Sequence, residues 1–152
     1  VVEFFFTECQ SICPIMNKQM ARVFHDLGAN KNLKIFSYSI DPDRDDLDKL
    51  KLYADNHRAD LNQWYFLHSP IDSVIRLAWS LKLPAGMGEN ALDSNDIPHS
   101  ERFVLVDWDR NIRGYYNGTD SISINKMMNH IVLLMSEKDR LDRKKIKNEQ
   151  AK

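Results

Sequence analysis

The chain has 152 residues, of which 43% are hydrophobic and 28% are charged, and its formal net charge is −1 at pH 7. This length favours one domain with a full core, and the balanced charge provides no general attraction to nucleic acid or to an anionic membrane. Its two cysteines are too few for a disulfide scaffold. No apolar run approaches the roughly 20 residues of a membrane span. The chain opens inside a strand-like run without a methionine, so we expect a trimmed domain.

The first segment joins an apolar strand to a helix through a short polar loop. The apolar run at 1–6 indicates a strand buried on both faces. Pro14 suits the first position of a helix, because its missing N–H would have no partner there. Apolar residues at helical spacing then continue to Leu27, and Gly28 is a preferred residue just past a helix end. The pattern predicts a helix from about Pro14 to Leu27.

The rest of the chain alternates strands and helices. The pattern predicts strands at 33–40, 64–67, 102–107 and 112–116, and helices at about 45–57, at 71–81 and from about 122 to 135. A long irregular stretch at 83–98 is of a length that usually carries function. We expect a layered α/β domain at 1–135 with a mixed sheet, followed at 136–152 by a charged helix extension or tail.

The two cysteines occupy the loop between the first strand and the first helix. Cys13 lies at the predicted helix N-terminus, where the helix dipole favours a thiolate and should lower the pKa of the thiol. Cys9 precedes it by four residues, close enough for both sulfur atoms to turn toward one point. The pair indicates a redox site or a soft-metal site such as one for Cu(I). A structural disulfide or two buried thiols is the alternative.

His99 is the best candidate for a third ligand. It ends the long loop and opens the strand at 102–107, and sites in α/β sheets assemble at strand ends. The alternative is an ordinary surface histidine. The other histidines are solvated or lie on helix faces: His25, His57, His68 and His130. The acidic run at 41–48 lacks the glycine and glutamate of a calcium loop, so helix capping is the better interpretation.

Three segments in order resemble the Sco/SenC copper-chaperone family. The first is Phe4-Phe5-Phe6-Thr7-x-Cys9-x-x-x-Cys13-Pro14, the second runs from Ser37 through Asp41-Pro42-Asp43-Arg44-Asp45, and the third is His99-Ser100 ahead of the strand at 103–107. With the segment 112–116, the resemblance covers roughly 1–134. The residue before His99 is Pro98, where many relatives are expected to carry an acidic residue.

The resemblance implies a thioredoxin-like fold that binds copper through two cysteines and one histidine, here Cys9, Cys13 and His99. It implies a role in assembling the CuA centre of cytochrome c oxidase subunit II, and contact with other copper chaperones. It also implies a monomer on the periplasmic side of the bacterial inner membrane, or in the mitochondrial intermembrane space. There it would be tethered through a segment before Val1.

We therefore expect a metallochaperone rather than a turnover enzyme. The main rival is a thiol–disulfide oxidoreductase that uses Cys9 and Cys13 as a redox pair without His99, and the two roles are compatible. A peroxidase is a third reading, because it needs only a sensitive cysteine of low pKa. A purely structural domain is the fourth.

Overall fold

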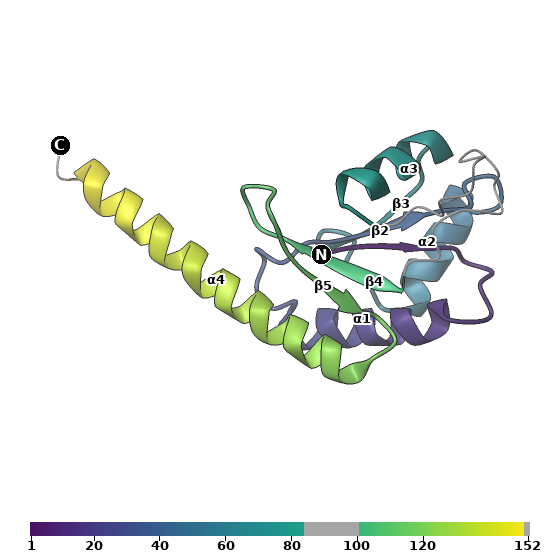
Figure 1. Ribbon diagram of the computed structural model, residues 1–152, viewed down its shortest axis with the longest axis horizontal. Coiled ribbons are helices and arrows are strands. Elements are labelled where there is room, and N and C mark those ends of the chain that lie inside the picture. The colour runs from purple at the N-terminus through teal and green to yellow at the C-terminus, as the bar shows by residue number, and fades with distance from the viewer. Residues whose placement is uncertain (84–100, 151–152) are drawn as a thin grey trace.

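The computed structural model describes residues 1–83 and 101–150 of the chain. The described residues form one five-stranded sheet with helices against both faces (Figure 1). The elements follow the expected order: β1 (Val2–Phe5), α1 (Cys13–Leu27), β2 (Ile35–Ser39), α2 (Leu47–Asn56), β3 (Trp64–Leu67), α3 (Ile71–Ser80), β4 (Arg102–Val106), β5 (Ile112–Asn117) and α4 (Ser121–Gln150).

The strand that precedes the cysteine loop lies at the centre of the sheet, whose order is β3-β2-β1-β4-β5. β1 pairs in parallel with β2, from Val2 opposite Phe36 to Phe5 opposite Ser39, and β2 pairs in parallel with β3. β4 pairs antiparallel with β1 and with β5. The sheet is therefore mixed, as predicted, and a central strand buried on both faces accounts for the continuous apolar run at the start of the chain.

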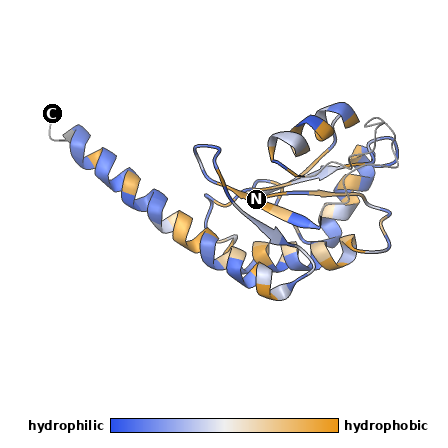
Figure 2. Cartoon of the chain, viewed as in Figure 1, coloured by the Kyte–Doolittle hydropathy of each residue, from blue (hydrophilic) through white to orange (hydrophobic). Residues whose placement is uncertain are grey.

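Successive side chains of β1 point into different cores, as the pleat of a strand requires. Phe5 packs in a cluster with Leu50 of α2, while Phe4 packs with Val74 and Ala78 of α3 on the opposite face. The largest cluster joins α1, α4 and the sheet, and it includes the fully buried Trp64 of β3. Figure 2 shows hydrophobic residues in each of the helices that pack on the sheet, while the far half of α4 is mostly hydrophilic.

The ends of α1 agree with the prediction to within one residue. α1 begins at Cys13, which places Pro14 at the second helical position. Gly28 ends α1 with φ −68°, so it supplies room and not a left-handed turn: a Cβ there would lie 2.4 Å from the carbonyl oxygen of Phe24. α4 continues as a helix to Gln150. The stretch predicted to be irregular at 83–98 lies almost wholly outside the described residues, and so does His99.

Candidate dithiol site

The two cysteines lie together under the surface, as free thiols. Cys9 is in the loop after β1 and Cys13 is the first residue of α1, and their exposed fractions are 9% and 5%. The Cys9 Sγ lies 3.6 Å from the Ser11 Oγ, and the Cys9 N–H donates to the Phe6 carbonyl at 3.4 Å. The apolar side chains around the pair shield it from water: Phe5, Phe6, Ile12, Leu50, Tyr53 and Phe66.

The two thiols are electrostatically unequal, in the opposite sense to the prediction. Burial, and then the hydrogen bond between its thiol and Cys9, raise the pKa of Cys13 to about 12. Burial also opposes ionisation of Cys9, but hydrogen bonds from Cys13 and Ser11 outweigh it and lower the Cys9 pKa. The prediction that the helix dipole lowers the pKa of Cys13 is therefore wrong, because burial dominates and Cys13 acts as the hydrogen-bond donor. Cys9 is the readier thiolate, and Cys13 holds its proton.

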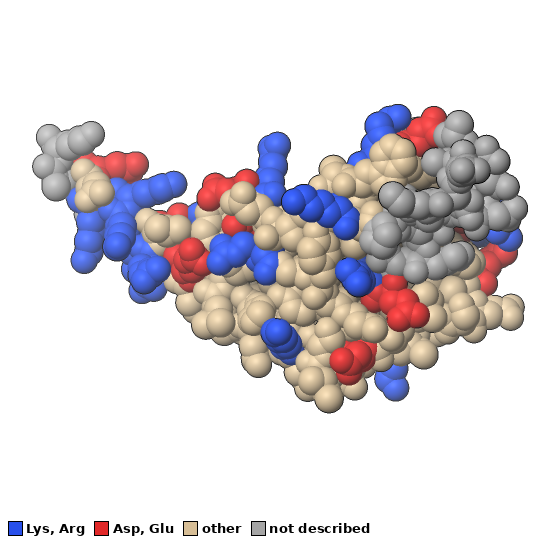
Figure 3. All heavy atoms as spheres, in the orientation of Figure 1, with Lys and Arg blue, Asp and Glu red and all other residues tan. Residues whose placement is uncertain are grey.

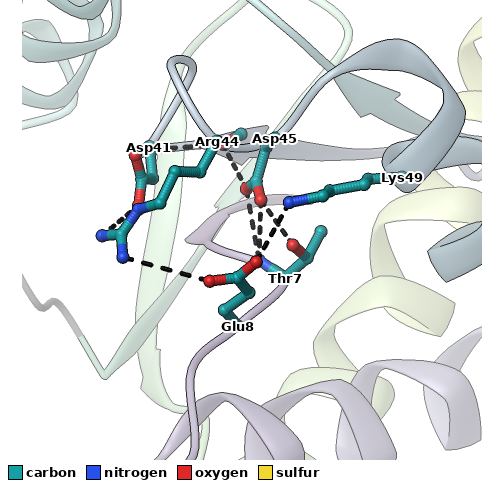
Figure 4. Close-up of polar contacts among 7 residues, drawn as sticks. Thr7, Glu8, Asp41, Arg44, Asp45 and Lys49 are labelled. Carbon is teal, nitrogen blue, oxygen red and sulfur yellow. Dashed lines mark hydrogen bonds and ion pairs between the residues drawn. The ribbon is translucent and has the colours of Figure 1, made fainter.

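A buried carboxylate holds the start of the cysteine loop (Figure 4). Asp45 is only 1% exposed. It accepts hydrogen bonds from the Thr7 N–H at 3.2 Å, from the Thr7 Oγ1 at 2.5 Å and from the Ser39 Oγ at 2.6 Å. These bonds tie the loop to the end of β2 and compensate for burying the charge. Two residues before Cys9, the backbone is thus fixed by a residue 38 positions along the chain.

Exposed ion pairs surround this anchor. Glu8 lies 3.0 Å from the Lys49 Nζ and 4.0 Å from Arg44, whose guanidinium also lies 2.5 Å from Asp41. Surface pairs of this kind contribute little to stability. They do, however, set which charges surround the loop, and the two cations here are offset by carboxylates.

For the acidic run at 41–48, the sequence predicted the role of Asp46 but not that of Asp45. Asp46 is the N-cap of α2, since its side chain accepts from the Lys49 N–H at 2.8 Å, and the capping interpretation is confirmed for that residue. Asp45 is not a cap: it turns inward to Thr7. A signal for this contact was available, because Thr7 and Asp45 both belong to the segments that carry the family resemblance.

A second carboxylate is buried in the sheet on the side of the cysteines. Glu3 of β1 is 0% exposed and accepts from the Ser37 Oγ at 2.5 Å, while the Trp64 Nε1 donates to the same hydroxyl at 2.8 Å. The other Glu3 oxygen, Oε2, has no partner among the described residues. Burial raises the pKa of Glu3 to about 7, against the hydrogen bond from Ser37 that lowers it. A glutamate inside an apolar run was the sequence signal, and the predictions did not use it.

Asn17 is the other incompletely paired polar residue near the cysteines. It lies one helical turn after Cys13, it is 0% exposed, and its Nδ2 donates to the Tyr53 hydroxyl. Its Oδ1 has no partner within the described part of the chain. Because Tyr53 also stacks on Phe5, with ring centroids 5.1 Å apart, this bond links α1 to α2 beside the thiols.

The structure brings together two of the three predicted ligands. Within residues 1–83 and 101–150, no group of three or more His, Cys, Asp and Glu side chains is arranged to hold a metal ion. His99 lies outside those residues. Two of the other histidines already have hydrogen-bond partners. The His57 Nδ1 lies 2.8 Å from the Tyr53 carbonyl oxygen, and the His130 Nδ1 lies 2.7 Å from the Tyr116 hydroxyl. The described helices include none both long and apolar enough to cross a membrane.

The chain is similar in sequence to known proteins of one family. The family model described as SCO1/SenC matches residues 1–136. A SCO1 protein homolog of Bacillus subtilis (strain 168) is 28% identical over 132 residues, which cover 86% of this chain and 68% of that protein. A protein of Stutzerimonas stutzeri named for copper binding is 30% identical over 117 residues, covering 76% of this chain but only 56% of that protein.

Solved structures agree on the fold. A SCO1/SenC family lipoprotein from Bacillus anthracis superposes with a TM-score of 0.72 at 23% identity, covering 88% of this chain and 79% of that one. BsSco, a Sco-family cytochrome c oxidase assembly protein with a disulfide switch, gives 0.71 at 27% identity, covering 89% and 78%. Copper-bound ScoI of Bradyrhizobium japonicum gives 0.61 at 18% identity, covering 85% and 82%. The expected thioredoxin-like α/β fold is confirmed, and the chain belongs to the SCO1/SenC family.

Proposed function

We propose that this chain is a copper metallochaperone in which Cys9 and Cys13 bind Cu(I) as thiolates and His99 is the third ligand. The observation that carries the proposal is that Cys9 and Cys13 are both free thiols and lie buried in one apolar cluster. Soft thiolates select Cu(I) over the harder cations. The apolar surroundings of the pair keep water away from a bound ion.

The unequal thiols predict how copper binding depends on pH. Cys13 holds its proton up to a pKa of about 12, so its ligation of Cu(I) must release a proton throughout the physiological range. We expect the apparent Cu(I) affinity to rise by at least about tenfold for each pH unit between about pH 6 and about pH 8. Binding that does not change with pH would mean that Cys13 is not a ligand.

The role in the cell follows from kinship. We propose that the chain delivers copper to the CuA site of cytochrome c oxidase subunit II, or keeps the cysteines of that site reduced. BsSco is a cytochrome c oxidase assembly protein, and the Stutzerimonas stutzeri relative is named for copper binding. We place the protein on the periplasmic side of a bacterial inner membrane, held there by an anchor.

Thiol–disulfide exchange is the second candidate, and the inequality of the thiols favours it specifically. The Cys9 thiolate would attack one sulfur of a partner disulfide, form a mixed disulfide and release the other partner sulfur as a thiolate. Cys13, on losing its proton, would then attack Cys9, so that the pair is oxidised to a disulfide and the partner is fully reduced. His99 has no part in this reaction.

The deciding experiment is an anaerobic Cu(I) competition titration of the fully reduced protein, run beside His99→Ala and Cys13→Ser. One tight equivalent that weakens in both variants supports the three-ligand site. Tight binding indifferent to His99→Ala removes the histidine from the proposal. If the intact protein binds no copper tightly but reduces a model disulfide, the chaperone proposal fails and the exchange reaction takes its place.

A further inference from the structure

The far half of α4 extends away from the rest of the domain, beyond the last side-chain contacts of the helix with β5 and with the loop before it. The last buried residue of the helix is Leu134, 9% exposed. Just beyond it, Glu137 lies 3.4 Å from the Arg113 Nη2, and the Lys138 Nζ lies 5.9 Å from the Trp108 ring centroid. Past these contacts the helix projects alone into solvent as far as Gln150 (Figure 1). The two contacts set the direction in which it points.

Of the five basic residues at 139–149, four lie on one side of the helix, and Lys145 lies on the other. At 3.6 residues per turn, Arg140, Arg143, Lys144 and Lys147 fall within an arc of about 100°. The acidic residues fall outside that arc: Glu137, Asp139, Asp142 and Glu149. We call the four cations the basic face of α4. Figure 3 shows lysine and arginine side chains gathered at this end of the molecule.

No acidic partner balances the basic face within the described part of the chain. The ion pair of this region, Lys138 with Asp142 at 2.6 Å, belongs to the other side of the helix. All four residues of the basic face are exposed. Like charges three and four residues apart destabilise a helix, and a solvated helix of this length is marginal without packing. An anionic surface against the basic face would remove the repulsion and stabilise the helix.

We propose that the basic face of α4 docks on the anionic phospholipid headgroups of a bilayer. Clusters of four or more Lys and Arg on one helix face are typical of such binding. Protein interfaces, in contrast, are depleted in Lys and have an apolar centre. The two exposed apolar residues of the projection, Leu141 and Ile146, lie on different sides of the basic face, so no apolar strip joins it. The docking is therefore electrostatic, without insertion of side chains into the bilayer. The net charge of −1 for the whole chain does not reveal this local positive charge.

The proposal is independent of copper binding, and vesicle flotation tests it directly. The full chain is mixed with vesicles of phosphatidylcholine alone, or with about 25 mol% phosphatidylglycerol, at about 20 mM and about 300 mM NaCl. The test variant changes the four residues of the basic face to Gln. A matched control changes four exposed basic residues elsewhere to Gln, with the same loss of charge: Lys18, Lys51, Arg58 and Lys82.

We expect binding to the phosphatidylglycerol vesicles at low salt, its loss at high salt, and none to phosphatidylcholine alone. A cation at such a surface contributes about fivefold, so the test variant should bind at least tenfold more weakly while the control binds normally. Lys144→Arg with Lys147→Arg should also bind normally. Equal weakening of test and control variants would overturn the proposal. So would salt-independent binding, or binding to an acidic protein column but to neither kind of vesicle.

Discussion

Replacing Glu3 by Gln should stabilise the protein, and by an amount that grows with pH. Gln keeps an oxygen to accept the Ser37 hydrogen bond, which is 2.5 Å long, but it cannot carry a charge. In the native protein the Glu3 carboxyl must ionise inside the core above its pKa of about 7, while the unfolded chain ionises near 4.5. Ionisation therefore destabilises the native state, and the variant avoids that penalty.

The size of the effect follows from the pKa difference. The shift is 7 − 4.5 = 2.5, and at 1.36 kcal/mol for each pKa unit it corresponds to about 3 kcal/mol. Because the native pKa is raised, the stabilising contribution of the protonated carboxyl is complete below pH 4.5 and is lost as the pH rises through 7. The unfolding free energy of Glu3→Gln minus that of the native protein should thus rise by about 3 kcal/mol between about pH 4.5 and about pH 8.

Urea denaturation of the reduced protein across this pH range measures the difference, provided that the slope m is unchanged. Glu8→Gln is the matched control, since the Glu8 side chain is 53% exposed and its pairs with Lys49 and Arg44 are at the surface. Its difference from the native protein should stay within about 0.5 kcal/mol at every pH. A Glu3→Gln difference that is flat with pH, or that has the opposite slope, would refute the reasoning.

Three further results are expected. Asp45→Ala should lower the unfolding free energy by about 3 kcal/mol in denaturant titrations, because it removes the hydrogen bonds from Thr7 and Ser39 to the buried carboxylate. The control Asp43→Ala, at an exposed position, should change the unfolding free energy by less than about 0.5 kcal/mol. Asp46→Ala should cost about 1 kcal/mol as a lost N-cap, and a cost near zero would contradict the capping role. Limited alkylation with iodoacetamide near pH 7, followed by peptide mass spectrometry, should modify Cys9 before Cys13, and the reverse order would overturn the assigned inequality of the thiols.

The order of elements was predictable because its signals are local. The apolar run of β1, Pro14 near the start of α1 and Gly28 at its end are each read within a few residues. The start of α2 was predicted two residues early for a non-local reason. Asp45 is of a residue type that often caps helices, but its side chain binds Thr7, which is 38 positions away. The N-cap of α2 is therefore Asp46. Residue type and position near the helix start cannot show which of the two adjacent aspartates is the cap.

That Cys9 and Cys13 lie close together was predictable from the sequence, but the pKa difference between them was not. Helix position alone gave Cys13 the lower pKa, since the dipole was the one effect visible in sequence. The burial of Cys13 depends on tertiary packing, in a cluster with Phe5 and Leu50, and this burial raises the pKa of the thiol instead. His99 stays a prediction, because it lies outside the described residues.

The two thiols also differ in how firmly they are held, and this bears on either proposed chemistry. Cys13 is part of α1, whose inner face is fixed by Met16 and Met20 in the main core. Cys9 follows the anchored Thr7 but is itself held by a 3.4 Å backbone bond and a 3.6 Å contact with Ser11. We infer that Cys9, both the readier thiolate and the less constrained, is where a recipient or a partner disulfide first engages. In copper transfer Cys13 would keep the remaining bond to the ion, whereas in disulfide exchange Cys13 would lose its proton, attack Cys9 and release the second sulfur of the partner as a thiolate.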